Sequence, residues 1–155
     1  CFSWIIFIYY IWISTITIIF EKMINDKIIE IASNTKFYGL KNNYTHKASI
    51  KNKKCGDKIV VEINIKYNKI INMRYETESC IFCQASASIL ANKISLLDIK
   101  DLKQDVDIVL SCFKEKKAKL PKRLNTFKKI VNKSTASRLD CIILPFKAIK
   151  KALKV

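Results

Sequence analysis

Glycine and proline are nearly absent from this chain of 155 residues, which contains Gly 2 and Pro 2. Collagen-like repeats and flexible linkers need far more of both residues, so the sequence belongs to neither class. Half of the chain is hydrophobic, which excludes the low-hydrophobicity type of disordered protein. The length predicts one domain, because domains usually run to about 100–150 residues.

Acidic residues and arginine are also scarce. The chain has 29 Lys and Arg against 13 Asp and Glu, a formal net charge of +16. Its arginines are Arg74, Arg123 and Arg138. Nucleic-acid sites favour arginine for bidentate contacts and interleave aromatic residues for stacking. The lysines here are scattered over every segment, so we expect a solvated surface and no specific nucleic-acid partner.

The N-terminal segment is a hydrophobic run without a charge, from Phe2 to Phe20. It is long enough for a membrane-spanning helix, which needs about 20 residues. The first methionine, Met23, stands just after this run. We therefore interpret residues 1–22 as a spurious upstream extension, and residues 23–155 as the domain. A membrane is expected as a partner only if residues 1–22 are real.

Alternating polar and apolar residues predict a β-hairpin in the middle of the chain. The pattern covers residues 59–66, with Ile71, Met73 and Tyr75 on the buried face of the next strand. The polar stretch at 37–54 has room for one edge strand, and 24–34 has helical spacing.

Helices dominate the second half of the sequence. The expected spans are residues 81–94, 99–113, 121–131 and 144–153. Strands followed by a run of helices favour an α+β fold, in which several helices pack on a small antiparallel sheet of about three strands.

Six cysteines are present, and disulfide frameworks are rare in the reducing cytoplasm, where we expect this domain. Cys112 lies on the apolar face of a helix and is expected to be a packing residue. Cys83 shares a helix face with Cys80, which leaves two interpretations open. It is either an extra ligand and persulfide relay or a buried thiol. His46, the single histidine, is expected at the surface.

Cys1 belongs to the N-terminal segment 1–22, and the remaining cysteines fall at the boundaries of predicted elements, where fixed backbone holds side chains that are still accessible. Thiols at helix N-termini have depressed pKa values, and thiolate is the form that binds metals and attacks sulfur. Gly56 lets Cys55 and Asp57 approach one centre through a tight turn. With Cys80 and Cys141, they offer three thiolates and one carboxylate. This set can close a zinc site or hold the iron atoms of a small cluster.

At these residues the sequence resembles the NifU N-terminal family of iron–sulfur cluster assembly proteins, the IscU and SufU type. The matching stretches are Cys55-Gly56-Asp57, then Cys80-x-x-x-x-Ala85-Ser86-Ala87-Ser88, then Ser137-Arg138-x-x-Cys141 before Lys147-Ala148-x-x-x-Ala152-Leu153. Cys80 and Cys141 are 61 positions apart, a gap closer to the SufU branch. The chain departs from the IscU type in carrying Asp140 where that branch has histidine, and it lacks the Leu-Pro-Pro-Val-Lys chaperone stretch.

The resemblance implies a NifU/IscU/SufU-like fold and a non-enzymatic scaffold. Cys55, Asp57, Cys80 and Cys141 would hold a transient [2Fe-2S] cluster or iron, built with sulfur from a cysteine desulfurase and passed to acceptor or carrier proteins. Cys55 and Cys141 are the candidates for accepting persulfide sulfur. The alternative is a zinc-dependent sulfurtransferase that relays sulfur from the desulfurase.

Overall fold

The computed structural model describes residues 8, 11, 12, 14, 26–95, 97–115, 120–131 and 133–154. Most of the hydrophobic N-terminal run lies outside the described residues, so its interpretation stays a prediction. Within the described parts of the chain, no helix is both long and apolar enough to cross a membrane.

One antiparallel sheet forms the base of the fold, with strand order β1-β2-β3. The strands are β1 (His46–Lys51), β2 (Lys58–Lys66) and β3 (Lys69–Glu78). β2 and β3 are joined by Tyr67 and Asn68, whose φ angles are 50° and 61°. Positive φ at both central residues is the geometry that matches the twist of a two-residue hairpin. The predicted hairpin, edge strand and α+β fold are confirmed.

The register of β3 differs from the sequence prediction near its start. Asn64 pairs with Asn72, whereas Ile65 pairs with Ile70, so a bulge leaves Ile71 without a partner. Ile71 is 43% exposed and Ile70 is fully buried in its place. The expectation that Ile71 faces the core was therefore wrong, because one extra residue reverses the alternation of side chains.

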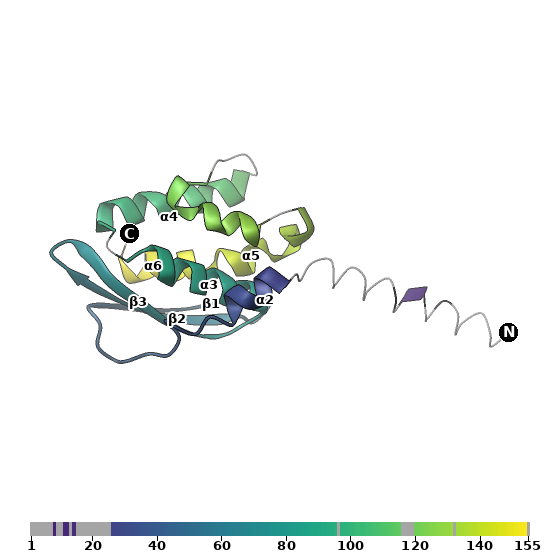
Figure 1. Ribbon diagram of the computed structural model, residues 1–155, viewed down its shortest axis with the longest axis horizontal. Coiled ribbons are helices and arrows are strands. Elements are labelled where there is room, and N and C mark those ends of the chain that lie inside the picture. The colour runs from purple at the N-terminus through teal and green to yellow at the C-terminus, as the bar shows by residue number, and fades with distance from the viewer. Residues whose placement is uncertain are drawn as a thin grey trace.

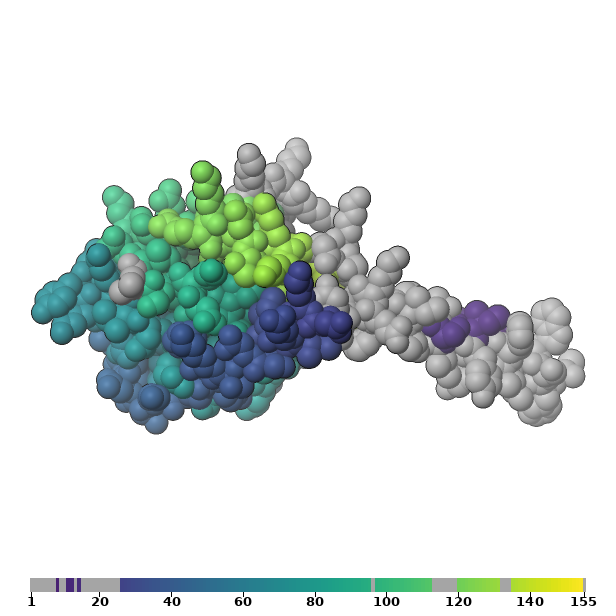
Figure 2. Space-filling view, in the orientation of Figure 1, coloured from purple at the N-terminus to yellow at the C-terminus, as the bar shows by residue number. Residues whose placement is uncertain are grey.

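The helices cover one face of the sheet in two layers (Figure 1). Their bounds are α2 (Asp26–Ala32), α3 (Ile81–Lys93), α4 (Ile99–Glu115), α5 (Leu139–Ile142) and α6 (Leu144–Ala152), with 3₁₀ helices η1 (Lys122–Lys129) and η2 (Lys133–Arg138). α3 and α6 contact the strands, while α4 packs on α6 and η1 packs on α3. α2, dark blue in Figure 2, packs against α3 at the side.

The helix predictions are confirmed except between Pro121 and Cys141. There the structure has the 3₁₀ helix η1 in place of the α-helix expected at 121–131, and the 3₁₀ helix η2 and the short helix α5 follow where no helix was predicted. Leu124 and Phe127 are buried as expected. α3 is buried on every side because Ala85, Ser86, Ala87 and Ser88 permit close packing, and it is the central helix of the domain.

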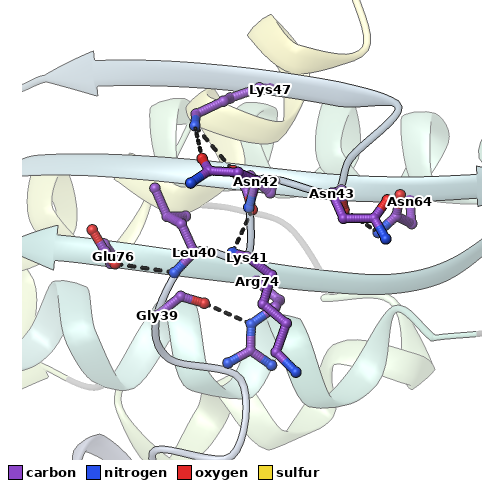
Figure 3. Close-up of polar contacts among 10 residues, drawn as sticks. Gly39, Leu40, Lys41, Asn42, Asn43, Lys47, Asn64, Arg74 and Glu76 are labelled. Carbon is purple, nitrogen blue, oxygen red and sulfur yellow. Dashed lines mark hydrogen bonds and ion pairs between the residues drawn. The ribbon is translucent and has the colours of Figure 1, made fainter.

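The opposite face of the sheet is crossed and partly covered by residues 37–45, the covering segment (Figure 3). Its first part pairs with the edge of β3, and its Gly39 carbonyl accepts a hydrogen bond of 2.6 Å from Arg74 Nε. The Leu40 amide then donates to Glu76 Oε1 at 3.0 Å. These bonds carry the chain from the edge of β3 across the sheet to β1.

Glu62 on β2 is the main anchor of the covering segment and is only 2% exposed. Its Oε2 accepts hydrogen bonds from the backbone amides of Lys41 at 3.0 Å and Asn42 at 3.2 Å, and Lys47 Nζ lies 2.9 Å from Oε1. Burial raises the pKa of Glu62, but these hydrogen bonds outweigh burial and hold the pKa below the ordinary value of 4.5. Glu62 therefore fixes the covering segment as a carboxylate.

Candidate functional site

The turn between β1 and β2 carries Cys55 and Asp57, and Asn52 organises it. The Asn52 amide donates to the Asp57 carbonyl at 2.7 Å, and the Asn52 carbonyl accepts from the Gly56 amide at 2.9 Å. Asn52 Oδ1 also accepts from the Lys54 amide at 3.0 Å. Gly56 has a φ of 81°, which glycine adopts without steric cost. The predicted tight turn is confirmed.

Cys80 follows the end of β3, beside this turn because Lys58 pairs with Glu78, and it is the N-cap residue of α3. Its carbonyl accepts from the amides of Cys83 at 3.1 Å and Gln84 at 3.2 Å, which begins the helix. Its own amide donates to Asp57 Oδ1 at 3.2 Å. One carboxylate oxygen thus ties the β1–β2 turn to the start of α3.

Cys141 lies on α5, and its thiol contacts the thiol of Cys55 in the turn. Its Sγ is 3.8 Å from the Sγ of Cys55, far beyond the roughly 2.05 Å of a disulfide bond. Two thiolates on one tetrahedral ion, with metal–sulfur bonds of about 2.3 Å, lie about 3.8 Å apart. The thiol pair already has the spacing that a shared metal ion requires.

Three donor atoms gather at this point. Ligand atoms of Cys55, Asp57 and Cys141 all lie within 4.8 Å of one another. Asp57 is 7% exposed, and no described group donates a hydrogen bond to its buried Oδ2. A buried carboxylate oxygen without a partner is costly unless a cation or donor reaches it. The residues present therefore fit a metal ion or an iron-containing cargo.

Cys80 is half-buried beside this group and outside the 4.8 Å cluster. Burial raises the pKa of its thiol, and Asp57 raises it further. Burial likewise raises the pKa of Cys141, and the neighbouring Cys80 adds to that shift. The expectation that Cys80 has a depressed pKa at its helix N-terminus was wrong for the metal-free protein, because desolvation and the Asp57 charge outweigh the helix dipole.

Cys83 is fully buried within α3 and contacts Thr77, whose Oγ1 lies 3.9 Å from its Sγ. Burial raises the pKa of this thiol to about 12. It does not belong to the group of donors within 4.8 Å. These features favour the buried-thiol interpretation over the extra-ligand one. Cys112 is also buried, on α4, and His46 is half-buried at the start of β1.

Two residues at the site were missed by sequence reasoning. Lys54 Nζ and Asp140 Oδ2 form an ion pair of 2.8 Å, and they directly precede Cys55 and Cys141 in the chain. The hydrogen bond from Lys54 lowers the pKa of Asp140. Only the departure at Asp140 from the IscU pattern hinted at this contact. The ion pair joins the turn to α5 at the rim of the site.

Two thiols and one carboxylate gather at one point, and the Cys80 thiol at the start of α3 lies beside them. Soft thiolates suit zinc and cluster iron, and a carboxylate is a harder, weaker ligand for such iron. Cys55 is exposed while Cys141 is buried. The arrangement can therefore hold a thiophilic metal on its buried side and meet another protein at Cys55.

Comparisons with known proteins agree with this geometry. The family model for the NifU-like N terminal domain matches residues 23–155. The chain is 28% identical to the iron–sulfur cluster assembly scaffold protein IscU of Thermotoga maritima, covering 88% of this chain and 96% of that protein. It is 30% identical to a protein of Borreliella burgdorferi without an assigned function, covering 84% of this chain and 82% of that one.

Solved structures share the fold. A NifU-like protein (N-terminal) from Brucella abortus has a TM-score of 0.76 at 20% identity, covering 88% of this chain and 95% of that chain. A candidate scaffold protein for the SUF system from Fervidobacterium islandicum has a TM-score of 0.77 at 20% identity, covering 85% of this chain and 97% of that chain. The fold, the order of the cysteine motifs and the family match agree, and the chain belongs to the NifU-like N-terminal domain family.

Proposed function

We propose that this protein is a scaffold for iron–sulfur cluster assembly, with the cluster as its cargo. Cys55, Asp57, Cys80 and Cys141 would hold a [2Fe-2S] cluster until an acceptor protein takes it. The observation that carries the proposal is the buried Asp57 Oδ2, which has no hydrogen-bond donor among the described residues and lies in one group with two thiols.

The single carboxylate explains why such a site would release its cargo. Carboxylate oxygen binds cluster iron more weakly than thiolate sulfur does, so one of the four contacts is weak. Asp57 Oδ1 is meanwhile engaged by the Cys80 amide at 3.2 Å, which leaves Oδ2 for iron. A site of this kind holds a cluster loosely, as a scaffold must.

Sulfur would enter at Cys55, because this thiol is exposed whereas Cys141 is 4% exposed. The Cys55 thiolate attacks the outer sulfur of a persulfide on a cysteine desulfurase, and the donor sulfur–sulfur bond breaks. The sulfur stays on Cys55, and the desulfurase cysteine leaves as a thiolate. An electron donor of the partner system must then reduce this sulfur to sulfide.

The test is anaerobic purification of the full chain, followed by iron, sulfide and zinc analysis. Reconstitution with ferrous iron, cysteine and a desulfurase should produce the visible absorption of a cluster. Cys55→Ser and Cys141→Ser should prevent it, whereas Cys112→Ser, a change at a buried thiol on α4, should not. Asp57→Ala should form a cluster that an acceptor removes more slowly, and an unchanged transfer rate would refute its role in release.

The size of the donor group favours a second candidate, a zinc-dependent sulfurtransferase. Three ligand atoms within 4.8 Å fit around a single ion, and Cys80, whose thiol interacts with Asp57 and Cys141, would complete a tetrahedral site. In this function Cys55 would leave the ion to take sulfur from the desulfurase. Tightly bound zinc, no cluster after reconstitution and faster desulfurase turnover would establish this candidate and exclude the scaffold.

A further inference from the structure

A buried hydroxyl links the two helices that bring Cys80 and Cys141 to the site. Ser86 lies on α3, six positions after Cys80, and is 0% exposed. Its Oγ donates a hydrogen bond of 2.6 Å to the carbonyl of Ile142. Ile142 directly follows Cys141 and is the last residue of α5. One bond therefore connects both cysteine-bearing helices.

The chain around Ile142 explains why this carbonyl accepts from a side chain. α5 ends at Ile142, and α6 begins at Leu144 with Pro145 in its first turn. Proline has no N–H and its ring collides with the carbonyl four residues earlier, so the two helices cannot run on as one. Among the described backbone amides, none donates to the Ile142 carbonyl. The Ser86 hydroxyl therefore donates the hydrogen bond that this carbonyl would accept from a backbone amide in a continuous helix.

The short helix α5 depends on tertiary contacts such as this hydrogen bond. α5 has only four residues, Leu139–Ile142, and a helix of this length has little stability of its own. Its orientation must come from tertiary contacts, and Ser86 provides a buried, directional one beside Cys141. A serine in mid-helix often bonds back to its own helix, whereas here its hydroxyl points across to α5.

We propose that Ser86 is a positioning residue that holds Cys141 within reach of Cys55, Asp57 and Cys80. The proposal rests on the proposed metal or cluster site, and Ser86 itself touches no metal. Residues that orient metal ligands through a second contact typically change metal affinity by about 10–100-fold when they are replaced.

The chain offers a matched control two positions away. Ser88 is also buried on α3, at 2% exposure, but its hydroxyl bonds to the carbonyl of Asn34 at 3.4 Å, away from the cysteines. Ser86→Ala and Ser88→Ala thus remove the same group from the same helix. Alanine favours the helical state, so both variants should fold.

The experiment titrates the full metal-free chain with cobalt(II) and follows the visible bands of thiolate-bound tetrahedral cobalt. Ser86→Ala should weaken the cobalt dissociation constant by about tenfold or more, whereas Ser88→Ala should leave it unchanged. Ser86→Thr, which keeps the hydroxyl, should restore affinity. In the metal-free chain, iodoacetamide should label Cys141 faster in Ser86→Ala, with buried Cys83 unchanged as the internal reference.

Each outcome has a defined meaning. Equal affinities for Ser86→Ala and the wild-type chain, or equal weakening by Ser88→Ala, would overturn the positioning role. A Ser86→Ala variant that loses its cooperative thermal transition would also overturn it, because Ser86 would then support the whole fold. A wild-type chain without thiolate-bound cobalt would instead refute the proposed site and not the contact.

Discussion

Replacing Gly56 by alanine should damage the site more than it damages the fold. Gly56 lies between Cys55 and Asp57 with a φ of 81°, and Gly39 in the covering segment has a φ of 87°. An L-residue in the left-handed region costs about 1–2 kcal/mol. The pair Gly56→Ala and Gly39→Ala therefore places the same strain at the site and far from it.

Neither glycine substitution introduces a steric clash. A Cβ built on Gly56 meets no atom within 4 Å, and one on Gly39 meets only Arg74 Nη2 at 3.9 Å, an ordinary contact. Backbone strain is then the main cost at both positions. Each variant should lower the free energy of unfolding by about 1–2 kcal/mol, measured by urea denaturation.

Metal binding should separate the two variants. The strain at position 56 relaxes by rotating the backbone between Cys55 and Asp57, which disturbs two donors that lie within 4.8 Å. Cobalt(II) affinity should therefore fall in Gly56→Ala and stay unchanged in Gly39→Ala. Wild-type affinity in Gly56→Ala would refute the view that this turn conformation sets the site. Equal loss in both variants would show that affinity only follows global stability.

Three further results are expected. Cys83→Ala should lower stability by about 1 kcal/mol and leave the cobalt bands intact; altered bands would make this thiol a ligand. Asp140→Asn breaks the ion pair with Lys54, whose side chain is 81% exposed, so the free energy of unfolding should stay unchanged. Alkylation of Cys55 should become faster, because the turn loses its contact with α5. An unchanged alkylation rate would show that the ion pair does not restrain the turn. Glu62→Gln should lower the free energy of unfolding by about 1–2 kcal/mol at neutral pH. Because the folded pKa of Glu62 lies below 4.5, that difference should vanish as the pH falls through the folded pKa, and a constant difference would show that the charge is irrelevant.

The secondary structure of this chain was largely predictable because its hydrophobic pattern is strong. In β2 the inward residues Ile59, Val61 and Ile63 recur at every second position and are fully buried. The bulge after Asn64 was not predictable, since Ile70 and Ile71 are chemically identical and only strand pairing decides which one faces the core. The 3₁₀ helices between Pro121 and Cys141 were missed for a related reason, because short helices depend on tertiary contacts.

Buried charge was the main failure of the sequence reasoning. Glu62 alternates with the core residues of β2 and so lies on the outer face of the sheet, yet the covering segment buries it. Asp105 on α4 is 3% exposed beside Arg123, whose Nε lies 3.0 Å from its Oδ2. In both cases the partner comes from a segment distant in the sequence. Local periodicity contains no information about such a partner, so a charged residue at a polar position reads as exposed.

The candidate site was more predictable than the buried charges and less predictable than the secondary structure. Chemistry and spacing singled out Cys55, Asp57, Cys80 and Cys141, and the structure places three of them in one group with Cys80 beside it. The ionisation of the thiols was not predictable, since the helix dipole of α3 is local whereas the burial that opposes it is a property of the whole fold. Desolvation dominates because a thiolate loses more in leaving water than one helix end returns.

The donors come from parts of the chain that only the complete fold brings together. Cys55 and Cys141 are 86 positions apart, and each lies on an element too short to hold its position alone: a turn and a four-residue helix. The contacts that fix them are the Asp57–Cys80 and Ser86–Ile142 hydrogen bonds. A ligand that binds the folded chain alone also stabilises it, by an amount that grows with ligand concentration over the dissociation constant. If the site holds the proposed metal or cluster, its occupancy and the free energy of unfolding should therefore rise together, and a substitution that weakens the α3–α5 junction should reduce both.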